Sequence, residues 1–257
     1  MAAQYVLVKK LFTIEPDIRD IILDHVIPNS RLINGLEKGQ IIIATSNKDD
    51  DFVKKYIEGE GKVLFIPQGV TVIGDNAFSQ STLVGPQEFA SKLVAVHFPD
   101  SLKVIEGEAF RHCIGLRELK FPPSLIELWG FSFEGCTGLT EVHFPAGLPV
   151  VEAAAFQGCT ALTTIHFPVD SVLKKLEYAV FEGCKSLTTV MLPNSLKTIE
   201  FHAFKDCKSL TNVTLPASLQ KIDPRAFKGC RNLTTVYCTP EVHPLLTPAM
   251  QRKVQLL

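Results

Sequence analysis

Six cysteines recur between residues 113 and 230 at an almost constant interval, and this regularity limits the fold more than any other feature. The separations between successive cysteines are 23, 23, 25, 23 and 23 residues. The six cysteines are Cys113, Cys136, Cys159, Cys184, Cys207 and Cys230. A phenylalanine lies three residues before each cysteine, and a leucine lies three residues after it. Three residue types that keep one register over six units indicate an internal repeat, which predicts a stack of similar structural units.

Each repeat also contains a short segment with strand character. After the leucine, apolar and polar residues alternate up to a proline, as in "LTEVHFP" and "LTTIHFP". In the first of these, a period of two directs Val142 and Phe144 to one face of the strand, and Glu141 and His143 to the other. We count eight such segments between residues 64 and 238. At about 4.8 Å per strand, they would form a parallel sheet roughly 35 to 40 Å wide.

The remaining apolar residues of a repeat cannot be buried by that repeat alone. Phe133, Cys136 and Leu139 are three residues apart, which fits the inner side of a short helical or 3₁₀ turn. A second apolar pair with the same spacing, such as Leu125 and Leu128, precedes each of these turns. Stacking of the units would bury all of these residues in one continuous core.

The repeats resemble leucine-rich repeats of the BspA-like, or Treponema pallidum, type. The pattern of that type is Cys-x-x-Leu-x-x-Ile-x-Leu-Pro-x-Ser-Leu-x-x-Ile-Gly-x-x-Ala-Phe. One unit matches it at Cys184, Leu187, Val190, Leu192, Pro193, Ser195, Leu196, Ile199, Ala203 and Phe204. The resemblance implies a repeat solenoid, which is a curved leucine-rich-repeat stack with a parallel β-sheet, short helical or 3₁₀ turns, and α/β capping segments. It also implies a context, because BspA-like repeats are associated with surface proteins that attach to host components.

The repeat region divides the chain into three predicted parts. Residues 1–62 form an N-terminal cap or small α/β domain, in which "TIEPDIRDIILDHVIP" is typical of a helix and "GQIIIAT" of a strand. Residues 63–238 form the solenoid, with an insertion near 79–90 because Phe78 and Phe110 are 32 residues apart. Residues 239–257 form a C-terminal cap helix, with Thr247 as its N-cap and Pro248 after it.

Charge and hydropathy exclude two classes of partner. The chain has 26 basic and 27 acidic residues and a net charge of −1, without a long block of one sign, so neither nucleic acid nor an anionic membrane surface is favoured. The apolar stretches are far shorter than the ~20 residues that span a bilayer. The N-terminal residues lack the pattern of a classical signal peptide. We therefore expect a cytoplasmic protein, or one exported without a classical signal.

The seven cysteines allow two interpretations. Cysteines in register on stacked units could have Cα atoms ~5 Å apart, which permits a disulfide. An odd number of cysteines without a signal peptide instead favours reduced thiols that pack as small apolar residues. We favour the second interpretation, which extends to Cys238 because it occupies an inward strand position. Zinc binding by cysteine is not favoured, since the repeats contain no closely spaced Cys pair.

The outward positions of the strand segments align across repeats into rows of side chains. The row two residues before each proline, or its equivalent, contains His97, Lys120, His143, His166, Met191, Thr214 and Tyr237, and Glu118 and Glu141 belong to the row four residues before. Glu141, His143 and His166 could bind a borderline metal ion. Open sheet faces, however, lack the surrounding groups that orient metal ligands, so we expect no metal and no cofactor. We expect these rows to contact a partner.

Trp129 directly follows the second apolar pair of its repeat, at a position where the neighbouring repeats have an acidic residue. It lies in "LIELWGFSF" beside Ile126 and Phe131, where other repeats have polar or small residues. An exposed tryptophan with apolar neighbours is typical of an interaction hot spot. A tryptophan that packs against the next repeat would fill a local gap instead, and both interpretations remain open.

We find no motif that supports catalysis. The sequence lacks a phosphate-binding glycine loop and a nucleophile elbow, and residues 1–62 contain no recognised catalytic constellation. The leading hypothesis is therefore a non-enzymatic scaffold that binds an unidentified protein partner through His97, Glu118, Lys120, Trp129, Glu141, His143, His166, Met191 and Tyr237. The alternatives are a surface adhesin or exported host-interacting effector, and a structural protein that associates with itself.

Overall fold

The computed structural model describes residues 42–44, 62–66, 69–79 and 91–257. The helices predicted within residues 1–62 and most of the insertion predicted near 79–90 lie outside the described residues. The strand predicted at "GQIIIAT" is confirmed as β1 (Ile42–Ala44), which pairs antiparallel with the first strand of the repeats.

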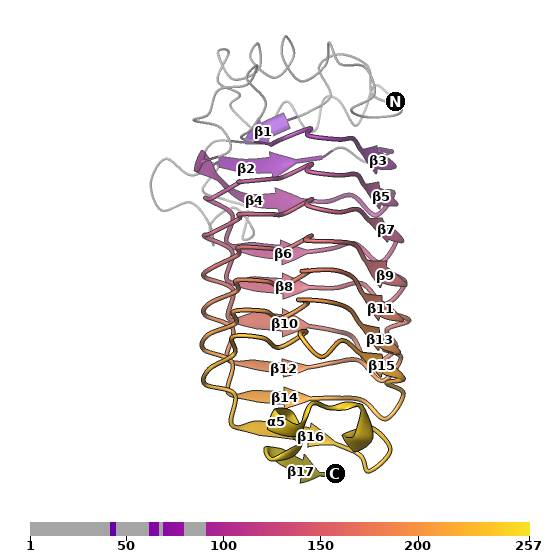
Figure 1. Ribbon diagram of the computed structural model, residues 1–257. Coiled ribbons are helices and arrows are strands. Elements are labelled where there is room, and N and C mark those ends of the chain that lie inside the picture. The colour runs from indigo at the N-terminus through magenta and orange to yellow at the C-terminus, as the bar shows by residue number, and fades with distance from the viewer. Residues whose placement is uncertain (1–41, 45–61, 67–68, 80–90) are drawn as a thin grey trace.

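The eight predicted strand segments form one column of parallel strands that runs the length of the stack (Figure 1). We call it the first strand column. Its members are β2 (Lys62–Phe65), β4 (Leu93–His97), β6 (Glu118–Lys120), β8 (Glu141–His143), β10 (Thr164–His166), β12 (Thr189–Met191), β14 (Asn212–Thr214) and β16 (Thr235–Cys238). The predicted parallel repeat solenoid is therefore confirmed.

A second column of two-residue parallel strands lies on the opposite side of the stack (Figure 1). Its members are β3 (Val72–Ile73), β5 (Val104–Ile105), β7 (Glu127–Leu128), β9 (Val150–Val151), β11 (Lys175–Leu176), β13 (Thr198–Ile199) and β15 (Lys221–Ile222). Each includes the last residue of the second apolar pair, whose burial the sequence predicted. The sequence did not predict the strands themselves.

The segments between the second and first columns are turns. Backbone N–H groups of Cys136 and Leu139 donate to the carbonyl oxygens of Phe133 and Cys136 at 3.4 and 3.0 Å, which is the i to i+3 bonding of a 3₁₀ turn. The turns do not continue into helices because Gly135 has a φ of +70°. A Cβ at Gly135 would lie 2.1 Å from His112 Nδ1, so a larger residue here would also have to displace the His112 ring.

The core is built around a ladder of phenylalanine rings, one from each repeat. Neighbouring rings stack at centroid distances of 5.0 to 5.6 Å and interplanar angles of 4 to 19°. The ladder consists of Phe78, Phe110, Phe133, Phe156, Phe181, Phe204 and Phe227. A second set of rings from the first strand column meets this ladder edge to face, as Phe144 does with Phe156 at 5.5 Å. The rings join the repeats into one continuous core.

The cysteines form a second ladder beside the phenylalanines. All seven are free and buried, as predicted. In each repeat the thiol donates to the carbonyl oxygen of the phenylalanine in the preceding repeat, as from Cys159 Sγ to Phe133 O at 3.3 Å. The same bond occurs at Cys113, Cys136, Cys184, Cys207 and Cys230, at 3.0 to 3.4 Å. Phe133 O also accepts from the Cys136 backbone N–H, so the thiol of Cys159 adds a second hydrogen bond to this carbonyl and joins it to the next repeat.

The last residues add a short helix and a strand. A 3₁₀ turn, η1 (His243–Leu245), is followed by α5 (Pro248–Gln251), and Thr247 accepts a hydrogen bond from the Met250 N–H as the predicted N-cap. The final strand, β17 (Val254–Leu256), pairs parallel with β16. Residues 239–257 therefore extend the first strand column in addition to forming the predicted helix.

Candidate functional site

Two histidines and a glutamate meet on the outward face of the first strand column. β8 and β10 are parallel and in register, so His143 lies directly beside His166. Their rings stack at a centroid distance of 4.3 Å and an angle of 11°. Glu141 Oε1 lies 2.9 Å from His143 Nε2 and 2.6 Å from His166 Nε2. One carboxylate oxygen therefore joins both imidazoles.

Glu118 and Lys120 on β6 border this group. Glu118 Oε1 lies 2.6 Å from Lys120 Nζ and 3.7 Å from His143 Nε2. The sequence placed Glu118 in an outward row of exposed residues, but its side chain is only 8% exposed because Lys120 and His143 lie against its carboxylate. Burial lowers the pKa of His143, and the nearby His166 lowers it further. His143 is therefore favoured in its neutral form at neutral pH.

The arrangement has two chemical capacities. As a hydrogen-bonded group, it can present imidazole and carboxylate edges to a partner. As a set of donor atoms, it places one ligand atom each of Glu141, His143 and His166 within 4.8 Å of one another. The three residues were predicted as partner contacts and also considered as metal ligands, and the structure brings all three together.

The rest of the predicted row continues along the same strand column. Met191 on β12 is 74% exposed, and its register partners on the following strands are Thr214 and then Tyr237. His97 lies on β4 and is exposed. The row runs past the histidine pair in both directions along the stack.

Trp129 lies apart from this row, in the turn after β7. It is 37% exposed, and its indole N–H donates to Glu127 Oε2 at 3.0 Å. Ile126 and Phe131 nearby in the sequence are also exposed. Trp129 thus has an exposed part and a packed part, and the three residues leave apolar surface accessible on this side of the stack.

A second aromatic group was not identified from the sequence. Tyr178 stacks on Phe201 at 5.8 Å, Phe201 stacks on His202 at 3.7 Å, and the guanidinium of Arg225 lies 5.4 Å from the Phe201 ring. These residues follow the second column in three consecutive repeats, at turn positions where the residue type differs from repeat to repeat. An aromatic residue at the same turn position in two adjacent repeats was the signal that could have revealed the group.

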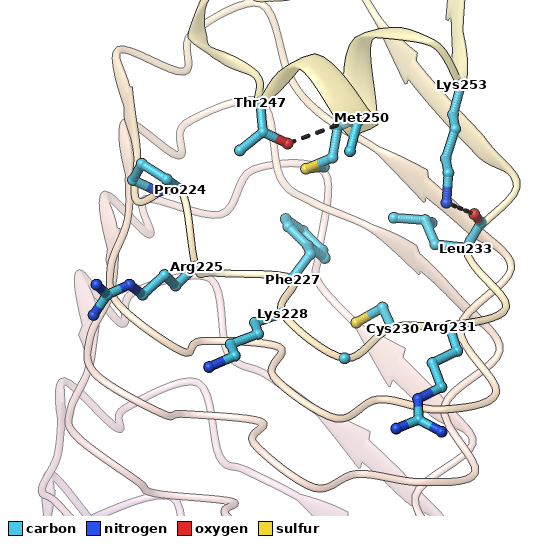
Figure 2. Close-up of a pocket in the computed structure, with 12 residues that line it drawn as sticks. Pro224, Arg225, Phe227, Lys228, Cys230, Arg231, Leu233, Thr247, Met250 and Lys253 are labelled. Atoms are coloured by element: carbon cyan, nitrogen blue, oxygen red, sulfur yellow. Dashed lines mark hydrogen bonds between the residues drawn. The ribbon is translucent and has the colours of Figure 1, made fainter.

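A pocket of about 320 Å³ lies between the last repeat and α5 (Figure 2). Phe227 and Met250 face each other in it, and Lys253 Nζ donates to the Leu233 carbonyl oxygen. Its basic lining residues are Arg225, Lys228, Arg231 and Lys253. The charged ends of Arg225, Lys228 and Arg231 point away from Phe227 and Met250, so these basic groups are not directed into the pocket (Figure 2).

The repeat period, the two parallel strand columns and the buried ladders together define a solenoid of leucine-rich repeats. The chain belongs to the BspA-type leucine-rich repeat family, because the sequence model of that family, described as "BspA type Leucine rich repeat region (6 copies)", matches residues 84–172 and 170–251. This family supports a protein-interaction scaffold in general, and its fold is typically non-enzymatic. Among the described residues, no helix is long and apolar enough to cross a membrane.

Solved structures of bacterial leucine-rich repeat proteins are similar to this chain. A leucine-rich repeat protein from Eubacterium ventriosum is 28% identical with a TM-score of 0.58, and the match covers 64% of this chain and 42% of that one. The T. pallidum leucine-rich repeat protein is 26% identical with a TM-score of 0.50, covering 78% of this chain and 80% of that one. This chain thus spans less than half the length of the Eubacterium protein. No curated protein matched the sequence.

Proposed function

We propose that this protein is a non-enzymatic scaffold that captures a protein partner on the outward face of the first strand column. The observation that carries the proposal is the row of outward side chains, which are in strand register from β6 to β10 and from β12 to β16, with Met191 74% exposed within it. A stack of repeats presents such a row as an extended surface suited to a macromolecular partner.

The row offers different contacts along its length. Met191 provides a flexible apolar side chain that can adapt to a partner surface. Glu141, His143 and His166 provide polar groups held in place by their mutual contacts. Lys120 and His97 extend the polar part, and Trp129 forms a separate patch. Side chains that are already ordered lose less conformational entropy when a partner binds.

A charge placed on this face tests the proposal. Met191→Glu should abolish partner capture, because the partner would have to desolvate a carboxylate where it previously met an apolar group. Capture is measured by crosslinking and affinity isolation from the native environment, followed by quantification of the same isolated protein for each variant. Trp129→Ala, in a second arm, tests whether the separate patch contributes.

Val169→Glu is the matched control, because Val169 is also an exposed apolar residue, at 99%, but lies in the loop after β10. It should leave capture unchanged. Equal capture by wild type and Met191→Glu would refute the assignment of this face. If the captured protein is a second copy of this chain, sedimentation at increasing concentration will identify a self-associating structural protein instead.

The cellular location is part of the same proposal. Seven free cysteines support a reducing compartment, and hence a cytoplasmic protein or an effector exported without a classical signal. The adhesin alternative requires a location outside the cell. Fractionation combined with thiol labelling of the unfolded protein distinguishes the two locations, because cysteines found oxidised at the cell surface would favour the adhesin.

A further inference from the structure

The group on β8 and β10 has the donor atoms of a transition-metal site. It provides two imidazole nitrogens and one carboxylate oxygen, and all three ligand atoms lie within 4.8 Å of one another. Two histidines and one glutamate are a ligand set that zinc uses in sites with an open fourth position. Imidazole ligands select such cations over calcium and magnesium, which prefer oxygen ligands.

The donors must adjust to admit an ion: the carboxylate has to withdraw, and the two imidazole rings, stacked at a centroid distance of 4.3 Å, have to tilt toward each other. In tetrahedral coordination with bonds of about 2.0 to 2.1 Å, neighbouring ligand atoms lie about 3.3 Å apart. Glu141 Oε1 is 2.9 and 2.6 Å from the two Nε2 atoms, so the carboxylate must withdraw by about half an ångström. The nearly parallel rings of His143 and His166 already direct both Nε2 atoms to the same carboxylate oxygen.

The surroundings of the donors favour a bound cation. The sequence predicted no metal because an open sheet face lacks groups that orient the ligands. In the structure, the buried carboxylate of Glu118 instead adds a negative charge near the donors, 3.7 Å from His143 Nε2. Glu118 Oε1 in turn forms an ion pair with Lys120 Nζ at 2.6 Å.

We propose that Glu141, His143 and His166 form a binding site for a divalent transition metal of the zinc type. Their two strands hold three ligands on the outward face of the stack, and Glu118 on β6 adds a negative charge beside them. Because Glu141 and His143 are half-buried and His166 is exposed, the fourth coordination position is open to water. The site joins β8 to β10, so a bound ion would also cross-link two adjacent repeats.

Titration with zinc ions tests the site without any knowledge of the partner. The full chain, first treated with a chelator and a reductant, is titrated with zinc chloride in a calorimeter. The double variant His143→Gln/His166→Gln retains polar side chains of similar length and should lose more than about 100-fold in zinc affinity. This figure assumes at least tenfold for each ligand, as found even for residues outside the coordination shell. Glu141→Gln should lose at least about tenfold.

His97→Gln is the matched control, since His97 is an outward histidine of the same row on β4. The zinc affinity of this variant should equal that of the wild type. Unchanged zinc affinity in the double variant would overturn the proposal.

Cobalt ions provide a second readout: nitrogen and oxygen ligands give weak visible bands that disappear in the double variant. An intense near-ultraviolet thiolate band would assign the bound metal to the cysteines and would also overturn the proposal. Circular dichroism of each variant verifies that it is folded.

Discussion

The inner and outer faces of the same strands differ sharply in how regular they are. On β8, Val142 is fully buried, whereas its neighbours Glu141 and His143 are half-buried on the opposite face. The inner position holds a β-branched or leucine residue in each of the neighbouring repeats. The outer position two residues before the proline changes from histidine to lysine, methionine, threonine and tyrosine along the stack.

This difference teaches which residues determine the fold and which are available for function. Inner residues contact the equivalent residues of the repeats on either side, so a change in one repeat must be accommodated by two neighbours. Outer residues contact solvent on one side and can vary without disturbing the stack. The proposed function therefore rests on outer residues that differ between repeats, such as His143, His166 and Met191, and on Trp129.

The largest expected effect is the loss of a ring from the middle of the phenylalanine ladder. Phe156 stacks between Phe133 and Phe181 at 5.5 and 5.6 Å and is fully buried. Phe156→Ala should lower the free energy of unfolding by about 3 to 5 kcal/mol, because it leaves a cavity between two repeats. Urea denaturation measures the change.

Phe227→Ala provides the comparison within the ladder. Phe227 stacks on Phe204 at the end of the ladder and is slightly exposed, so the same substitution should cost less there. Equal losses at the two positions would contradict the view that the contacts on both sides of a ring stabilise the stack.

The next largest effect is a loss of stability at high pH. Burial raises the pKa of the Cys113 and Cys159 thiols, so both stay protonated in the folded chain at pH values where unfolded cysteines ionise. Their contribution to stability is complete below the unfolded pKa of about 8.5 and decreases as the pH rises toward the folded pKa. The free energy of unfolding should therefore fall between pH 9 and pH 10.

A double variant isolates the contribution of these thiols. In Cys113→Ala/Cys159→Ala, the decrease should be shallower than in the wild type by up to about 2.7 kcal/mol per pH unit, since each group contributes up to about 1.4. Urea denaturation at several pH values measures both slopes. Lysine and tyrosine residues titrate in both proteins and cancel in the comparison. Identical slopes would mean that the thiols do not titrate differently in the folded and unfolded chains.

The smallest effect is expected on the outer face. Met191→Ala should change the free energy of unfolding by no more than about 0.5 kcal/mol, because the side chain is mostly in solvent. Val190, its neighbour on β12, is buried, and Val190→Ala should cost about 2 kcal/mol. Thermal denaturation of the pair compares the two faces of one strand directly. A large loss at Met191 would show that the outer row also stabilises the stack.

The inner half of the molecule could be predicted from the sequence because each inner position repeats. The period identified the strands of the first column, and the position of Cys159 between Phe156 and Leu162 identified it as a core residue. The strands of the second column could not be predicted, since a two-residue strand such as β7 is too short to produce an alternating pattern. Their pairing depends on the neighbouring repeats.

The outer half could be predicted only in part. Alternation placed His143 and His166 side by side, and the structure agrees. It could not reveal that Glu118 is buried, because that burial results from contacts with Lys120 and His143. Contacts made by long side chains between repeats depend on their rotamers, which a sequence period does not specify.

The ladder of thiol-to-carbonyl bonds has a mechanical consequence. Each bond joins a repeat to the one before it, as do the hydrogen bonds between neighbouring strands. Tension applied to the two ends of the stack would load all boundaries equally, so the weakest boundary would open first and the repeats would detach one after another. Each 23-residue unit would release about 80 Å of extended chain, minus the ~4.8 Å it occupied along the axis. A protein of this architecture would lengthen in steps under load and keep its remaining repeats folded.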